Sequence, residues 1–237
     1  TATMLRARQH LGASTLGVLG SVRQYAQDAG RNQVIGVDGY AAPTPQDQLR
    51  LRALASANTA GFDAEGALQA IPSERGHWLE ARWNRRTDGW IMNAMLRGVS
   101  PRFRNDNGFV EQSGIRRVEG ELNKRWGEVA WGALTAHEFE TFLWMQHTQA
   151  QRDAAGGIGT PHTQAARWHA GIWWAGAKNS EGLVNLLADR ERATPGSALR
   201  PVHKLAIEYG FNPAPWFTRA FVELQTGDVL DVAADRV

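Results

Sequence analysis

The chain has 237 residues, of which 43% are hydrophobic and 21% are charged, a balance that excludes a disordered or fibrous protein. Its 26 Lys and Arg residues face 24 Asp and Glu residues and form no dense basic run, so we expect no nucleic-acid partner. The absence of cysteine excludes disulfides, cysteine-ligated zinc and thiol catalysis.

Neither a membrane-spanning helix nor a signal peptide is expected. A helical span needs about 20 mostly apolar residues, and no segment of the sequence meets that requirement. Arg6 and Arg8 fall where the apolar core of a signal peptide would lie. Since the chain opens on Thr1 without an initiator Met, we expect a processed or truncated product.

Strict alternation of apolar and polar residues recurs along the chain and predicts β-strands. In the first clear case, Leu49 and Leu51 share one face of a strand, and Arg50 and Arg52 share the other. The segments with this alternation are, in chain order, Gln48–Ser56, His77–Arg85, Trp90–Gly98, Arg116–Trp126, Ala166–Trp174, His203–Phe211 and Trp216–Gln225.

Turn signals separate these segments. Thr87–Gly89 contains Asp-Gly and predicts a tight hairpin, because that pair tolerates positive φ. Further short turns are expected at Asn212–Pro215 and Thr226–Asp228, and longer connections at Ala60–Gly76, Ser100–Ser113, Arg152–Thr163 and Arg190–Arg200. Val129–Gln151 is less regular and fits one long strand or two short ones. We predict one all-β domain over residues 1–237, with about 12–13 antiparallel strands in up-and-down order.

Two architectures fit this pattern: a soluble sandwich, and an outer-membrane barrel with an apolar outer face and a polar lumen. The strongly charged polar faces and the small apolar residues opposite them favour the barrel. Tryptophans at strand ends favour it too, since they form a girdle at the membrane interface; these are Trp78, Trp90, Trp126 and Trp216.

The barrel assigns each strand residue to lipid or to the lumen, and a shift of one residue would invert the whole set. The residues predicted to face lipid are Leu79, Ala81, Val118, Leu122, Ile172, Trp174, Val222 and Leu224. Their neighbours Glu80, Arg117, Glu119 and Glu223 should then face the interior.

Four segments resemble a known family. Ser14–Tyr25 and Asn32–Gly39 are similar to paired strands of a family of bacterial outer-membrane barrels, and Val99–Val110 with Gly114–Arg117 looks like its most recognisable segment. Gly227–Asp231 also resembles a strand-turn-strand of this family, which is called domain of unknown function 5916. The resemblance implies a bacterial outer-membrane location and contact with lipid. It also implies an associated carbohydrate-binding, family 9-like domain in the full-length protein.

The sequence departs from this family at both ends. The binding domain that usually precedes the barrel is absent, and the last residue, Val237, is not the aromatic residue that usually closes an outer-membrane barrel. We therefore expect a fragment of a larger barrel, one that leaves edge strands to be paired.

No catalytic or metal-binding pattern stands out. His162 and His169 are seven residues apart but belong to a loop edge and a strand, and Gly156–Gly159 lacks the Lys of a phosphate-binding loop. Asn105–Gly108 could offer oxygen ligands to calcium, although its composition favours a tight turn. We expect no enzyme, no metal site and no cofactor.

The leading functional hypothesis is a non-enzymatic barrel that acts as a pore or as part of an uptake or docking apparatus, with an Arg-rich lumen for anionic or carbohydrate-like solutes. Its candidate lumen residues are Arg50, Arg52, Glu80, Arg82, Arg97, Arg117, Glu119, Glu121, Arg219 and Glu223, and Arg6 and Arg8 are also expected to face inward. These arginines either form an open positive stripe or fill the lumen as an Arg–Glu ladder. The alternative function is a soluble β-sandwich module that binds glycans.

Overall fold

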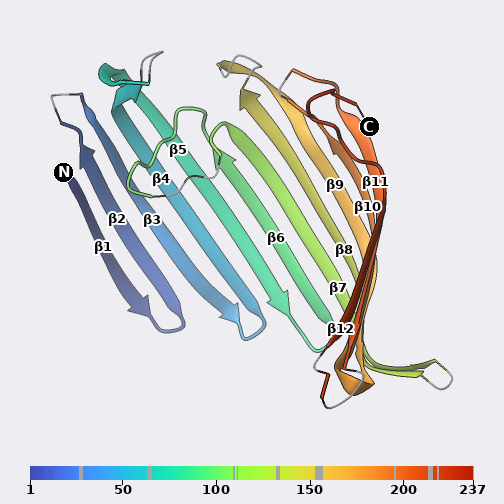
Figure 1. The fold of residues 1–237 in the computed structure, drawn as a ribbon. Coiled ribbons are helices and arrows are strands. Elements are labelled where there is room, and N and C mark those ends of the chain that lie inside the picture. Colours follow the sequence, from blue (N-terminus) through green and yellow to red (C-terminus); the bar gives the residue numbers. More distant parts are fainter. Residues whose placement is uncertain are drawn as a thin grey trace. The chain divides into compact units, whose positions relative to one another are not determined.

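The structure is a computed structural model that describes residues 1–26, 29–62, 66–108, 110, 112–131, 134–152, 157–194, 196–212, 216–217 and 219–236. Among these residues, twelve strands form one sheet in which each strand pairs with its neighbour in sequence (Figure 1). The strands are β1 Ala2–Leu11, β2 Ser14–Gln24, β3 Arg31–Thr44, β4 Asp47–Phe62, β5 Leu68–Arg86, β6 Trp90–Val99, β7 Ile115–Trp131, β8 Leu134–Arg152, β9 Ile158–Gly176, β10 Ser180–Glu191, β11 Arg200–Phe211 and β12 Ala220–Gly227.

The predicted all-β fold with up-and-down strand order is confirmed. The described residues include no α-helix; the short 3-10 helix η1 covers Ala177–Asn179. No helix among them is long and apolar enough to span a membrane. In the strand order β1 and β12 are the two end strands, so each has a single neighbour within the described sheet.

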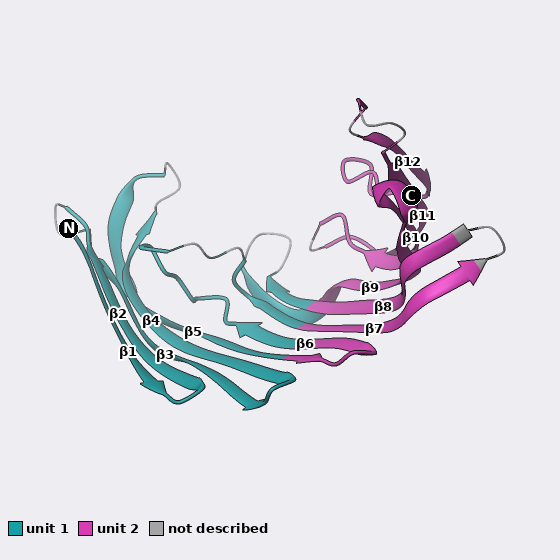
Figure 2. Ribbon diagram, turned by 90° about the horizontal axis from the view of Figure 1, so that it is seen from below, with its two compact units in different colours: residues 1–83, 95–117, 149–162 teal, residues 84–94, 118–148, 163–237 magenta. Residues whose placement is uncertain are grey.

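The chain divides into two compact units, shown in Figure 2. Unit 1 consists of residues 1–83, 95–117 and 149–162, and unit 2 consists of residues 84–94, 118–148 and 163–237. Strands β1 to β4 belong to unit 1 and β10 to β12 to unit 2, while β5 to β9 contribute residues to both.

Two of the four predicted long connections are shorter than predicted, because strands extend into them. The segment Ala60–Gly76 contains the end of β4 and the start of β5, and Arg152–Thr163 contains the start of β9. The connection at Ser100–Ser113 is confirmed, and Arg190–Arg200 largely so. Within Val129–Gln151, β7 ends at Trp131 and β8 begins at Leu134.

The predictions of tight turns agree better with the structure than those of long connections. At Thr87–Gly89 the amide of Thr87 donates to the carbonyl of Trp90 at 2.9 Å, which closes the predicted hairpin between β5 and β6. At Thr226–Asp228 the strand β12 ends at Gly227, whose φ of +131° favours glycine. The structure then has only a bridge between Asp231 and Arg236, so the strand-turn-strand expected at Gly227–Asp231 is absent from the described residues. Pro213–Pro215 of the other predicted turn and Gly156 lie outside the described residues.

In unit 1, the register gives the sheet one charged and one apolar face. Residues directly opposite each other in an antiparallel pair point to the same side. Arg8, Gly17, Asp38 and Arg52 form one such row across β1 to β4. The opposite face of the same strands carries Leu5, Ala7, Leu16, Val18, Val22, Ile35, Val37, Leu49, Leu51, Ala53 and Ala55.

This apolar face is uncovered. Leu49 is half-buried, and the exposed fraction of the other large side chains on this face rises from 39% at Val22 to 74% at Leu5. In an ordinary soluble domain such a face would be buried and the charged face would meet water. We refer to the charged side of unit 1 as its polar face.

Unit 2 has the same two-sided organisation. The row Ile172, Val184, Ile207 and Leu224 runs across β9 to β12, and the opposite face carries the row Arg167, Asp189 and Val202. Along β7, Val118 and Leu122 are exposed whereas Glu119 and Glu121 are half-buried. In β9 to β12 the register places Ile172, Trp174, Val222 and Leu224 on one face and Glu223 on the other, as the alternation predicts. That the first of these faces contacts lipid stays a prediction.

The only long connection to fold back over the polar face of unit 1, among the described residues, is the one between β6 and β7. We call its residues 100–108 the strap. Phe103 is buried with Val99 and Ile115, and Leu54, Trp78 and Val110 pack around this small core. The rings of Phe103 and Trp78 meet edge to face, with their centroids 5.8 Å apart. At Gly76 a Cβ atom would lie 2.3 Å from the Phe103 backbone, so this close approach requires glycine.

Candidate functional site

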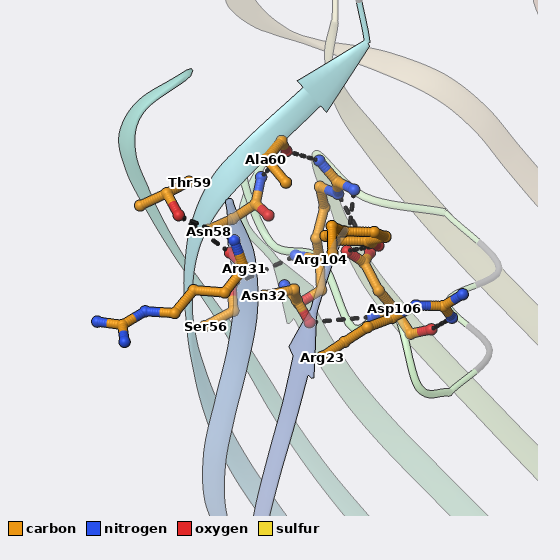
Figure 3. A network of polar contacts seen from close by, with 10 residues as sticks. Arg23, Arg31, Asn32, Ser56, Asn58, Thr59, Ala60, Arg104 and Asp106 are labelled. Atoms are coloured by element: carbon orange, nitrogen blue, oxygen red, sulfur yellow. Dashed lines mark hydrogen bonds and ion pairs between the residues drawn. The ribbon is translucent and has the colours of Figure 1, made fainter. Parts of the chain in front are cut away.

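The strap is held by polar groups of β2, β3 and β4 (Figure 3). The amide of Asn32 donates to the carbonyl of Arg104 at 3.2 Å, and its oxygen accepts from the backbone N–H of Asp106 at 3.1 Å. Arg104 donates to the carbonyl of Ala60 at 2.5 Å and its backbone N–H donates to the Ser56 hydroxyl at 3.3 Å. Asn32 is only 1% exposed, so the strap seals this end of the polar face.

Asp106 is the second anchor of the strap. Its carboxylate pairs with Arg104 at 2.9 Å and accepts the Tyr25 hydroxyl at 2.7 Å, while Arg23 donates to its backbone carbonyl at 2.7 Å. Burial and then the hydrogen bond to the Asp106 carboxylate raise the pKa of Tyr25 above its ordinary value. Because its oxygens are engaged in this way, the segment Asn105–Gly108 serves as a structural turn, closed by the Gly108 N–H to the Asn105 carbonyl at 3.1 Å.

Beyond the strap, the polar face of unit 1 contains an open cavity of about 620 Å³, which we call the arginine cavity. It is built mainly on alternate residues of β1, β3 and β4, whose side chains the register places on one side of the sheet. Residues of β5, Arg97 of β6 and Thr15 of β2 complete the lining. Its charged lining consists of Arg6, Arg8, Arg50, Arg52, Arg82, Arg97, Asp38 and Glu80, together with His10, Tyr40 and Trp78. Six guanidinium groups thus face two carboxylates, an excess of four positive charges.

Both carboxylates of the arginine cavity are already paired. Asp38 accepts two hydrogen bonds from Arg6, at 2.7 and 2.8 Å. Glu80 accepts from Arg82 at 2.9 Å through one oxygen and from Arg97 at 2.7 Å through the other. The arginine cavity therefore contains both a cross-strand Arg–Glu ladder and a surplus of cations.

Five of the ten predicted lumen residues meet in this cavity: Arg50, Arg52, Glu80, Arg82 and Arg97. Arg117 does not line it: this residue is half-buried, and its buried Nε atom has no hydrogen-bond partner among the described residues. The other four belong to unit 2. There Glu121 accepts from Asn93 at 2.5 Å and from Asn123 at 3.0 Å, Arg219 pairs with Glu181, Glu223 lies opposite Glu208 in the register, and Glu119 is half-buried.

The polar face of unit 2 has a different charge balance. Arg125 pairs with Glu138 and Glu140, and Arg167 pairs with Glu191. His169 contacts Asp189 at 3.1 Å rather than the His162 with which it was considered as a metal pair. Groups of three or more possible metal ligands are absent from the described residues. On this face Arg125 and Arg167 are thus paired with carboxylates, and two acids, Glu208 and Glu223, lie opposite each other.

Sequence reasoning missed Tyr40, Asp38 and the strap anchors. Trp78 was also misplaced: it lies on the polar face in the arginine cavity instead of in an interfacial girdle. Its position could have been derived from the alternation, since Trp78 shares the face of Glu80 and Arg82. Trp90 and Trp126 lie together with Lys124, whose ammonium is 4.9 Å and 5.5 Å from the two ring centroids.

Comparison with known proteins adds no relative. The sequence matches no model of a known protein family, and no curated protein or solved structure matches it.

Proposed function

We propose that this chain is part of the wall of a bacterial outer-membrane β-barrel, whose polar face lines an aqueous passage that favours anionic solutes. The observation that best supports this proposal is the difference between the two faces of unit 1. Leucine, isoleucine and valine side chains are exposed on one face, and charged groups line the cavity on the other. A barrel in lipid needs an apolar outer band and a polar interior, and this is how the two faces differ.

The energy at stake in water supports this proposal. Six side chains of the apolar face, each about half exposed or more, are Leu5, Leu16, Val18, Ile35, Val37 and Leu51. Covering them is worth on the order of 5–10 kcal/mol, at about 1.5–3 kcal/mol for each fully buried side chain. That sum is comparable with the whole stability of an ordinary domain, so something must cover this face.

Lipid is a better cover than a second sheet. All twelve strands of the described residues belong to one sheet, whereas the alternative β-sandwich needs two. In unit 2, Lys124 lies between Trp90 and Trp126, and Trp126 is 56% exposed. Exposed tryptophans with a neighbouring lysine suit the boundary between headgroups and acyl chains.

The family resemblance supports the same proposal. Three of the four segments that carry it contribute to the strap and its anchors: Ser14–Tyr25 supplies Tyr25, Asn32–Gly39 supplies Asn32, and Val99–Val110 supplies Asp106. The proposal also imposes a requirement: the free edges of β1 and β12 must find partners, because lipid cannot hydrogen-bond an open strand.

Single-cysteine labelling tests the proposal, and the cysteine-free chain needs no background substitutions. Leu51→Cys and Arg52→Cys are adjacent on β4 but point to opposite faces. In outer membranes, a water-soluble maleimide should label the cysteine of R52C and spare that of L51C, and both should react after denaturation. Val118→Cys and Glu119→Cys provide the same comparison in unit 2. Equal labelling of L51C and R52C in membranes would contradict a lipid-facing apolar side.

A further inference from the structure

The arginine cavity contains two cations that the protein itself does not neutralise. Asp38 pairs with Arg6 and lies 3.9 Å from Arg8, and Arg82 and Arg97 share Glu80. Within the described residues, by contrast, no carboxylate lies within 4.0 Å of Arg50 or Arg52, and both side chains are exposed in the cavity. Of the four excess positive charges in the arginine cavity, two therefore lie at these positions of β4, and the other two arise where a pair of arginines shares one carboxylate.

A glycine explains why Arg52 lacks a partner. Asp38 lies directly opposite Arg52 in the register of β3 and β4, and would be its natural cross-strand partner. On the other side, Asp38 faces Gly17 of β2, where a Cβ atom would lie 2.8 Å from a carboxylate oxygen of Asp38. Because Gly17 has no side chain, Asp38 can lean across β2 and bind Arg6 of β1 instead.

Aromatic rings accompany both free guanidinium groups. The Arg50 guanidinium lies 5.9 Å from the Tyr40 ring centroid, and that of Arg52 lies 5.9 Å from the Trp78 ring centroid. Such contacts restrict a guanidinium without removing its charge or occupying its N–H donors. Arg50 and Arg52 are two residues apart on one strand, so their backbones are separated by roughly 7 Å along it. Side chains as long as arginine can converge on one small group from that spacing.

We propose that Arg50 and Arg52 form a binding site for the sulfate or phosphate group of a solute. Guanidinium groups bind such oxyanions through paired N–H donors, and two of them match a doubly charged group better than a single carboxylate. This inference deepens the proposed function, since the site would lie in the proposed passage, but its binding can be measured without passage.

Calorimetric titration of the detergent-solubilised protein with inorganic phosphate and with sulfate, at constant ionic strength, tests the site. Arg50→Gln and Arg52→Gln should each weaken binding by about tenfold, since one charge-assisted hydrogen bond is worth roughly 1.5–3 kcal/mol. The matched control is Arg82→Gln, which removes the same charge from the same cavity but from a group already paired with Glu80. It should weaken binding by less than about threefold, as expected for a change in general potential alone. Acetate should bind more weakly than either dianion.

If R82Q and R50Q lost equal amounts of binding affinity, the inference would be wrong and only a diffuse positive potential would remain. The inference would also be wrong if R50Q and R52Q bound the dianions as tightly as the wild type. Arg50→Lys separates charge from geometry: it should bind less tightly than the wild type but more tightly than R50Q. Different results would contradict the proposed function and the binding site. Saturable binding without any passage of ions would leave the site standing, whereas an anion-selective pore without saturable binding would refute the site alone.

Discussion

The two ends of the polar face of unit 1 are built from the same strands but in opposite ways. Under the strap, the face carries uncharged groups such as Asn32, Ser56 and Asn58, all buried. A few residues further along the same strands, the polar face carries Asp38, Arg50 and Arg52, which line an open cavity. Where the chain covers the sheet, burial favours neutral groups, because an unpaired buried charge costs several kcal/mol. Where the face is open, water tolerates an excess of charge, and that charge is free to act on a solute.

The strongest way to break this contrast is to lift the strap by substituting Gly76→Ala. The added Cβ atom would lie 2.3 Å from the backbone of Phe103, so the strap must move away from β5. We expect a loss of about 3 kcal/mol in the free energy of unfolding, at the upper end of overpacking costs. Denaturant titration in detergent micelles measures this loss, and proteolysis near residues 100–108 reports on the strap itself.

Gly98→Ala is the matched control for this substitution. Gly98 lies in β6, and a Cβ atom there would meet nothing within 4 Å. This variant should be unchanged or slightly stabilised, since alanine in a strand has less conformational entropy to lose than glycine. Equal unfolding free energies of G76A and G98A would contradict the close contact between Gly76 and the strap.

The open half of this contrast was largely predictable from the sequence, and the covered half was not. Alternation placed Arg50 and Arg52 opposite Leu49 and Leu51, because the side-chain period of a strand is two whatever the fold. The strap depends on contacts between residues 72 and 74 positions apart, Asn32 with Arg104 and with Asp106, which no local pattern encodes.

Which arginines remain unpaired could not be predicted from the sequence alone. Composition places Arg and Glu on one face, but it leaves open which of them pair. Whether Asp38 neutralises Arg52 or Arg6 is decided by the missing side chain of Gly17, two strands away from Arg52. Strand ends were missed for a related reason. Polar segments such as Ala60–Gly76 suggested loops, whereas backbone pairing continues β5 back to Leu68.

An intermediate effect is expected on ion selectivity, which tests the role of the open end of the polar face. In a planar bilayer containing the full-length barrel, the double variant Arg50→Gln/Arg52→Gln should lose much of the preference for anions over cations, because the unpaired charges of the arginine cavity are gone. Reversal potentials in a salt gradient measure this preference. The control Arg125→Gln removes a cation that is paired with Glu138 and Glu140 in unit 2, and it should alter selectivity less. A barrel that inserts yet passes no current would refute the passage and leave the arginines as internal scaffolding.

The smallest expected effect is a pH dependence of the strap, carried by Tyr25. Its hydroxyl donates to Asp106, and its pKa in the folded protein is raised, first by burial and then by that carboxylate. A raised folded pKa means that the folded state retains the proton longer than the unfolded state. The contribution of the Tyr25 hydrogen bond to stability is therefore complete below the ordinary tyrosine pKa of about 10 and declines as the pH rises through the folded value.

At pH 8, Tyr25→Phe should lower the free energy of unfolding by about 1 kcal/mol, the typical contribution of one hydrogen bond. Above pH 10 the difference between wild type and Y25F should shrink. Unfolding free energies measured from pH 8 to pH 11 decide the matter, and a constant difference over that range would show that the Tyr25 hydroxyl does not hold the strap through its proton.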